Sequence, residues 1–125
     1  MAVSEFRKEL LKIMPGYNWT VHRSVSSDTR MIATGIQSAG FNRLSTLEVT
    51  RIEDATGATT YAVRSAGHGT RARWQHSNRD GTLARALRGL QDHYQRTAAN
   101  YQQLAQRLQD GRNAEPIHRR DGDEG

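Results

Sequence analysis

Residues 43–66 read RLSTLEVTRIEDATGATTYAVRSA, and this stretch decides the fold. Apolar and polar residues alternate over 43–53 and again over 59–66, which predicts two strands that each bury one face. Asp54-Ala55-Thr56-Gly57 between them has the composition of a turn. The alternation slips between Leu44 and Leu47, so we expect a β-bulge there. The stretch therefore predicts an antiparallel pair of strands.

The alternation continues toward the N-terminus and predicts two further strands. Trp19 and Val21 alternate with polar residues over about 17–25, and the next apolar series runs over about 30–37. Ser26-Ser27-Asp28 has turn composition. Four short strands with brief connections are typical of an antiparallel meander.

A short helix is expected before the sheet, over residues 4–14. Phe6, Leu10 and Met14 follow helical spacing and form one apolar stripe. Ser4 is a suitable N-cap, and Pro15-Gly16 ends the helix. We expect this stripe to lie on one face of the sheet.

A long helix is expected after the sheet, over 82–110, with Asp80 or Thr82 as its N-cap and Gly111 as its end. The gaps between its apolar residues alternate between four and three, as in a heptad stripe: Leu83, Leu87, Leu90, Tyr94, Thr97, Tyr101, Leu104 and Leu108. Such a helix spans about 40 Å, whereas a strand of about six residues spans about 20 Å. The sheet can therefore bury the first half alone. The second half needs another surface, which can be the N-terminal helix, a second copy of the chain or a different partner. A homodimer is the simplest of these, with the contact residues Tyr101, Leu104 and Leu108.

The predicted fold class is α+β, with a four-stranded antiparallel sheet packed by a short N-terminal helix and a long C-terminal helix. A chain of 125 residues has room for one domain, which we place over 1–111. Residues 112–125 contain one large aliphatic side chain, Ile117, so we expect a disordered tail. No apolar run is long enough to predict a transmembrane helix. The absence of cysteine suits a reducing cytoplasm.

Positive charge is concentrated in one segment of the chain. The net charge is +5, and residues 64–88 contain six arginines and one acid, Asp80. Residues 67–81 are expected to form a long loop that leads into the helix. Guanidinium groups, an indole ring and the N–H groups of a helix start are all suited to nucleic acid. The candidate contact residues are Arg64, His68, Arg71, Arg73, Trp74, Arg79, Arg85 and Arg88.

No catalytic centre, metal site or cofactor site is predicted. No two histidines have the i, i+4 spacing of a zinc-binding helix, and no cysteine supports them. The serines of the two Ser-Ala-Gly segments lack the Gly-x-Ser-x-Gly context of a nucleophile. We therefore expect a non-enzymatic binding protein that contacts nucleic acid. The same basic surface is also suited to an acidic protein partner.

A short pattern occurs twice in the chain. Ile36-Gln37-Ser38-Ala39-Gly40 is similar to Val63-Arg64-Ser65-Ala66-Gly67, and each is soon followed by an arginine, Arg43 or Arg71. The repetition is either chance in a chain rich in these small residues or a sign of two equivalent strand ends. In the second case the two arginines would lie at one edge of the sheet.

Four segments resemble small accessory proteins of bacterial mobile elements and phages: Met14-Pro-Gly-Tyr-Asn-Trp-Thr-Val-His22, Gly40-Phe-Asn-Arg-Leu-Ser-Thr46, Ser65-Ala-Gly-His-Gly-Thr-Arg71 and Thr82-Leu-Ala-Arg-Ala-Leu87. The likeness covers residues 5–110. It implies an accessory role, which includes inhibition of a host defence complex such as a CRISPR effector. An inhibitor that docks on a protein is therefore the alternative function.

Overall fold

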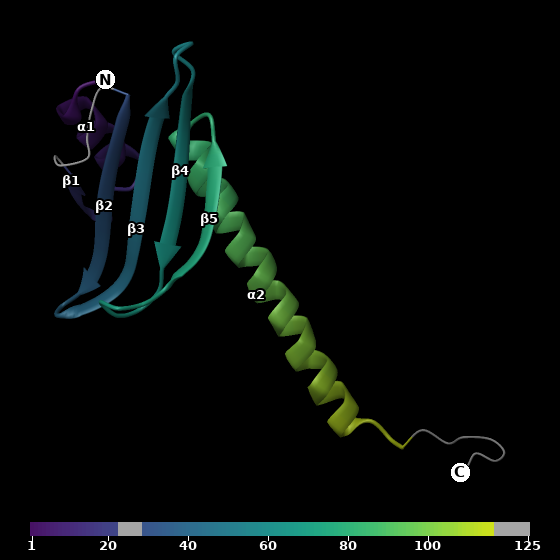
Figure 1. Cartoon of the computed structure of the whole chain (residues 1–125). Helices are drawn as coiled ribbons and strands as arrows, with labels where there is room; N and C mark the ends of the chain where they lie inside the picture. The colour runs from purple at the N-terminus through teal and green to yellow at the C-terminus, as the bar shows by residue number, and fades with distance from the viewer. Residues whose placement is uncertain (23–28, 117–125) are drawn as a thin grey trace. The chain divides into compact units, whose positions relative to one another are not determined.

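The computed structural model describes residues 1–22 and 29–116 and has the predicted α+β class. Its elements are α1 (Val3–Ile13), β1 (Asn18–Val21), β2 (Arg30–Ala39), β3 (Asn42–Glu53), β4 (Thr59–Ala66), β5 (Trp74–Asp80) and α2 (Leu83–Asn113). The strands form one antiparallel sheet in the order β1-β2-β3-β4-β5 (Figure 1). Contacts divide the chain into two compact units, Met1–Asp92 and one that begins at His93, whereas the sequence predicts one domain over 1–111.

The sheet has five strands, so the prediction of four strands followed by a loop over 67–81 is wrong. β5 lies within that segment and pairs antiparallel with β4. The strand escapes pattern analysis because Asp80 and Asn78, the residues opposite the buried Tyr61 and Val63 of β4, are polar. Asn78 lies opposite Val63, and its side-chain amide donates a hydrogen bond to the Ala86 carbonyl of α2, at 2.9 Å. A satisfied polar group can stand where an apolar residue is expected.

Two helix ends differ from expectation, and the start of α2 agrees with one of its two predicted N-caps. α1 begins at Val3, and the Glu5 carboxylate accepts a hydrogen bond from the Ala2 N–H at 2.8 Å, so Ser4 is not the N-cap. The prediction of Thr82 as the N-cap of α2 is confirmed, because its hydroxyl accepts the Arg85 N–H at 3.2 Å. Gly111 does not end α2, which continues to Asn113 and includes the start of the predicted tail.

Two predicted segments lie wholly or partly outside the described residues. They are the Ser26-Ser27-Asp28 turn and the part of the predicted tail that follows residue 116. The first predicted strand, over 17–25, is described over Asn18–Val21.

The core lies on one face of the sheet, beneath α1 and the first turns of α2, which lie on the same side in Figure 1. Its largest fully buried side chains are Phe6, Leu10, Met31, Leu83, Val49 and Val63. Trp19 is also buried, as its alternation predicts, and its ring lies over Gly35. A Cβ atom at Gly35 would lie 2.9 Å from three ring atoms, so the close approach requires glycine there.

The opposite face of the sheet carries a polar row that crosses all five strands. The strand register aligns Thr20, Thr34, Glu48, Arg64 and Ser77 as successive neighbours. We call this surface the open face. The two faces account for the alternation in the sequence, because successive side chains of a strand point to opposite sides.

A buried polar cluster connects α1 to the sheet. The Tyr61 hydroxyl donates to the Glu9 carboxylate at 2.8 Å and accepts from the Arg51 Nε at 3.3 Å. Arg51 is 9% exposed, and its Nη1 lies 3.6 Å from a carboxylate oxygen of Glu53. Burial, followed by the hydrogen bond to Glu9, raises the pKa of Tyr61.

The raised pKa of Tyr61 predicts a loss of stability in alkali. The folded state favours the neutral phenol, so its contribution is complete below the unfolded pKa of about 10 and is lost as the pH rises through the higher folded value. We expect Tyr61→Phe to cost about 1 kcal/mol at neutral pH through the lost hydrogen bond. Urea denaturation across the alkaline range should show a steeper fall for the wild type than for the variant. Parallel curves would contradict the assignment.

Candidate nucleic-acid interface

Two connections meet at one end of the sheet. β2 and β4 run in the same direction, so the turn after Ala39 and the loop after Ala66 lie at the same end. The Gly69 N–H donates to the Arg43 carbonyl at 3.0 Å and ties the two connections together. The repeated Ser-Ala-Gly pattern thus marks two strand ends at one end of the sheet, and arginines follow both.

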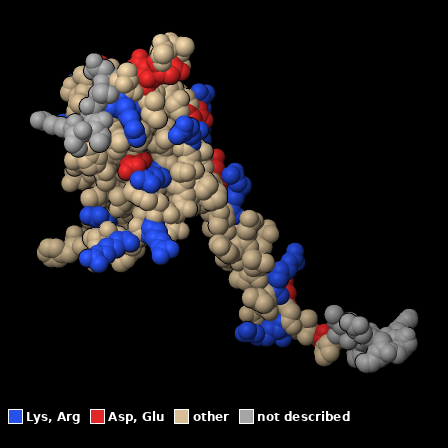
Figure 2. Space-filling model, in the orientation of Figure 1, with Lys and Arg blue, Asp and Glu red and all other residues tan. Residues whose placement is uncertain are grey.

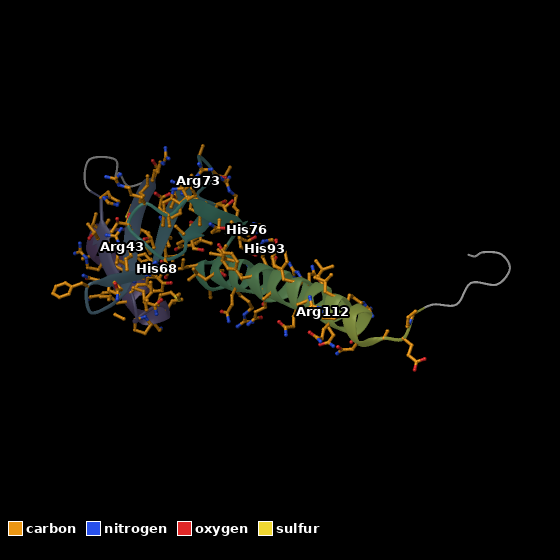
Figure 3. All side chains as sticks on the ribbon, turned by 90° about the horizontal axis from the view of Figure 1, so that it is seen from below. Arg43, His68, Arg73, His76, His93 and Arg112 are labelled. Carbon is orange, nitrogen blue, oxygen red and sulfur yellow. The ribbon has the colours of Figure 1, made fainter. Side chains whose placement is uncertain are left out.

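We call this surface the basic end, and define it by the residues Phe41, Arg43, His68, Arg71, Arg73 and Trp74. Figure 3 looks at the molecule from below and labels Arg43, His68 and Arg73. In Figure 2, which shows the open face, blue groups occur along the lower end of the sheet. Residues 36–47 and 65–79, which build this end, contain no acidic residue.

The three arginines of the basic end have no carboxylate partner among residues 1–22 and 29–116. Arg71 and Arg73 are exposed, and Arg43 is partly exposed. Like charges held near one another repel, more strongly near a protein surface than in bulk water. An anionic ligand would remove that cost, so the grouping is typical of a surface that binds anions.

The β2–β3 and β4–β5 pairs each carry a β-bulge next to the basic end. Gln37 faces Ser45 while Ser38 faces Arg43, which leaves Leu44 as the extra residue of β3. This confirms the predicted irregularity near Leu44. In β5 the extra residue is Gln75, because Ser65 faces His76 and Ala66 faces Trp74. Bulges change the direction of neighbouring side chains and are frequent beside functional sites.

Arg64 and Trp74 form a stacked pair on the open face. The Arg64 guanidinium carbon lies 4.1 Å from the centre of the Trp74 ring, a cation–π contact. The same guanidinium donates to both carboxylate oxygens of Glu48, from Nε at 2.9 Å and from Nη2 at 3.2 Å. Glu48 therefore fixes the plane of the guanidinium group and offsets its charge.

The remaining predicted contact residues do not join this surface. Arg79 lies on β5 opposite Ala62, and Arg85 and Arg88 lie on α2, which follows the other end of β5. Arg85 is paired with Asp80, Nε to Oδ1 at 3.1 Å. A strand of seven residues separates the loop from the helix start and spans about 20 Å. The loop, the ring and the helix start therefore do not converge as the sequence predicted.

Phe41 and Glu48 were not predicted as contributors to the interface, and Arg43 was named only through one of the two interpretations of the repeated pattern. Phe41 follows Gly40 in a two-residue turn between β2 and β3, and Gly40 has a φ of +61°, which favours glycine. The Phe41 ring is fully exposed, with a relative exposure of 109%. An aromatic residue in a Gly-x turn, followed by an arginine, was the available signal.

The last three residues of the apolar stripe, all in the second unit, are exposed. Relative exposures are 68% for Tyr101, 59% for Leu104 and 73% for Leu108. In the first unit the same stripe is buried at Leu83 and Leu90. The expected change from a buried first half to an unburied second half is therefore observed.

Residues 1–22 and 29–116 contain no group of three or more His, Cys, Asp or Glu residues placed to hold a metal ion. None of the helices described there has the length and apolar character to cross a membrane. In comparisons with known proteins, the chain matches no family model, no curated protein and no solved structure.

Proposed function

We propose that this chain is a small, non-enzymatic basic protein that binds nucleic acid through the basic end. The observation that carries the proposal is the grouping of Arg43, Arg71 and Arg73 without carboxylate partners among the described residues. Arg43 lies at the start of β3 and Arg71 and Arg73 lie in the loop after β4, and a backbone hydrogen bond from Gly69 to Arg43 joins the two segments. Arginine presents a planar fork of N–H donors that suits phosphate oxygens.

The aromatic residues of the same surface favour nucleic acid over a simple anion. Trp74 is 40% exposed, and Phe41 is fully exposed. Alternating cationic and aromatic groups fit a chain of phosphates and bases better than an isolated phosphate. Arg64 acts here by supporting Trp74, because its Nε and Nη2 are already hydrogen-bonded to Glu48.

A salt titration of binding tests this function. Fluorescence anisotropy with unrelated DNA and RNA oligonucleotides should show affinity that falls steeply with salt. Three phosphate contacts give a slope of about −2 to −3 in a plot of log affinity against log salt. Absence of binding at low salt would reject the proposal. It would favour the alternative function, a mobile-element inhibitor of a host defence complex that docks on a protein.

We further propose that the second unit pairs with a second copy of the chain. Most helical stability in proteins comes from the packing of an apolar face. The exposed Tyr101, Leu104 and Leu108 repeat at heptad spacing, which is the spacing of a helix pair. Closed two-fold dimers are the commonest oligomers.

A further inference from the structure

We propose that the basic end selects single-stranded over duplex nucleic acid, because it takes an unpaired base against the Arg64–Trp74 pair. This inference rests on the proposed function and names the class of ligand. In that pair the Arg64 guanidinium carbon lies 4.1 Å from the centre of the Trp74 ring. Both partners remain accessible, since the Arg64 side chain is 43% exposed and Trp74 is 40% exposed.

The pair is held in place before any ligand binds. The two hydrogen bonds from Arg64 to Glu48 fix the guanidinium plane, and Glu48 is itself only 24% exposed in its side chain. The bulge at Gln75 sets the direction of Trp74 at the start of β5. A fixed flat surface loses little conformational entropy on binding, which favours stacking of a base.

There is space beside the ring for a base. An open hollow of about 220 Å³ is lined by Arg64, Trp74, Gln75, His76 and Ser77. A cavity of about 150 Å³ holds a benzene ring, so a heterocyclic ring fits this volume. The Gln75 and Ser77 side chains are exposed at its border and can hydrogen-bond to a base edge.

Phe41 provides a second stacking position on the same connected surface. The register aligns Trp74 with Ala66 and Ala66 with Thr46, so Phe41 lies about five residues farther along β3 and two strands across. With strand spacings of about 3.3 Å per residue and about 4.8 Å between strands, the two rings lie roughly 20 Å apart. Arg43, at the start of β3, and Arg71 and Arg73, in the loop after β4, belong to the same end of the sheet, where the phosphates of a single strand would pass.

Duplex nucleic acid cannot use these rings in the same way. Its base faces are covered by neighbouring base pairs, whereas an unpaired base presents a free aromatic face to a protein side chain. A duplex would therefore contact the arginines without the rings. Aromatic substitutions should therefore weaken binding of the single strand but not of the duplex, whereas arginine substitutions should weaken binding of both.

The test compares Trp74→Leu with Trp74→Phe, using a short mixed-sequence single strand and the duplex made from it. Stacking contributes about 1–3 kcal/mol per base, so Trp74→Leu should weaken single-strand binding by about 5- to 150-fold. Trp74→Phe should retain most of the affinity, and both variants should bind the duplex as the wild type does. Thermal melting of each variant serves as the check on folding.

Tryptophan fluorescence gives an independent readout. The chain has two tryptophans, and Trp19 is 7% exposed, so quenching by a bound base reports on Trp74. The single strand should quench the wild type, and the duplex should not. Suppose that the wild type binds both ligands in a salt-dependent way. If Trp74→Leu then weakens binding of both ligands equally or of neither, or if the single strand does not quench the fluorescence, the single-strand inference is overturned and the proposed function stands. If neither ligand binds at low salt, both fail.

Discussion

Replacement of Arg43, Arg71 and Arg73 together by alanine is expected to lower the affinity for nucleic acid by about 10- to 100-fold, whatever the sequence of the ligand. Each exposed charge pair contributes up to about 1 kcal/mol, and about 1.4 kcal/mol corresponds to a factor of ten. The slope of log affinity against log salt should fall by about one for each lost phosphate contact. Anisotropy titrations at several salt concentrations measure both quantities.

A matched control distinguishes binding at a local site from binding driven by the total charge of the protein. Arg7 and Lys8 on α1 and Arg88 on α2 are exposed, and their replacement by alanine removes the same three charges. The control variant should keep most of the affinity of the wild type. Equal losses in both triple variants would show that net charge alone drives binding. A loss confined to one ligand sequence would indicate base recognition in place of phosphate contacts.

The double substitution Leu104→Asp, Leu108→Asp is expected to convert a dimer into a monomer. Tyr101 and Leu108 are equivalent positions of successive heptads, and Leu104 is the second apolar position between them. Two aspartates in this stripe would place four charges in a two-fold interface, where unpaired charges are strongly unfavourable. Sedimentation at tens of micromolar should give a dimer for the wild type and a monomer for the variant.

The flanking residues favour an antiparallel pair over a parallel one. In a parallel pair, Arg107 would lie beside Arg112 of the second copy, because the residues that flank the stripe on its two sides meet across the interface. In an antiparallel pair centred between Tyr101 and Leu104, Arg107 instead faces Asn100 of the second copy. Ala98 and Ala105 meet on the other side, where small side chains allow close approach.

The control for this experiment lies on the outer face of the same helix. Gln102→Asp, Gln109→Asp adds the same two charges at heptad spacing but away from the stripe. This variant should remain dimeric. A wild type that sediments as a monomer would exclude self-association and leave the exposed stripe for a foreign protein, as the inhibitor function requires.

Alternation and turn chemistry predicted most of the first unit. The strands near 30–37, 43–53 and 59–66 and the start of α2 follow rules that act over a few residues, and the structure confirms them. β5 could not be predicted in this way. Asn78 and Asp80 stand opposite buried residues of β4, and the Asn78 amide is satisfied by a carbonyl of α2, a contact that no local sequence pattern reveals.

The candidate site was also predicted only in part, because some of its contacts depend on strand order and register. The arginines at 71 and 73 stand out from composition alone, but the membership of Arg43 depends on strand order, which places two distant connections at one end. The pairing of Arg64 with Glu48 depends on the register between β3 and β4. Without that register, a neutralised arginine and a free arginine look identical in the sequence.

The meander also determines how this chain can fold. Every strand pairs with its neighbour in the chain, so the contact order of the sheet is low, and loop closure costs little entropy at each step. Each hairpin can form soon after its second strand leaves the ribosome. The Tyr61–Glu9 hydrogen bond joins residues 52 positions apart, so α1 gains this anchor once β4 has been made. α1 therefore gains this hydrogen bond only after four of the five strands of the sheet have been made.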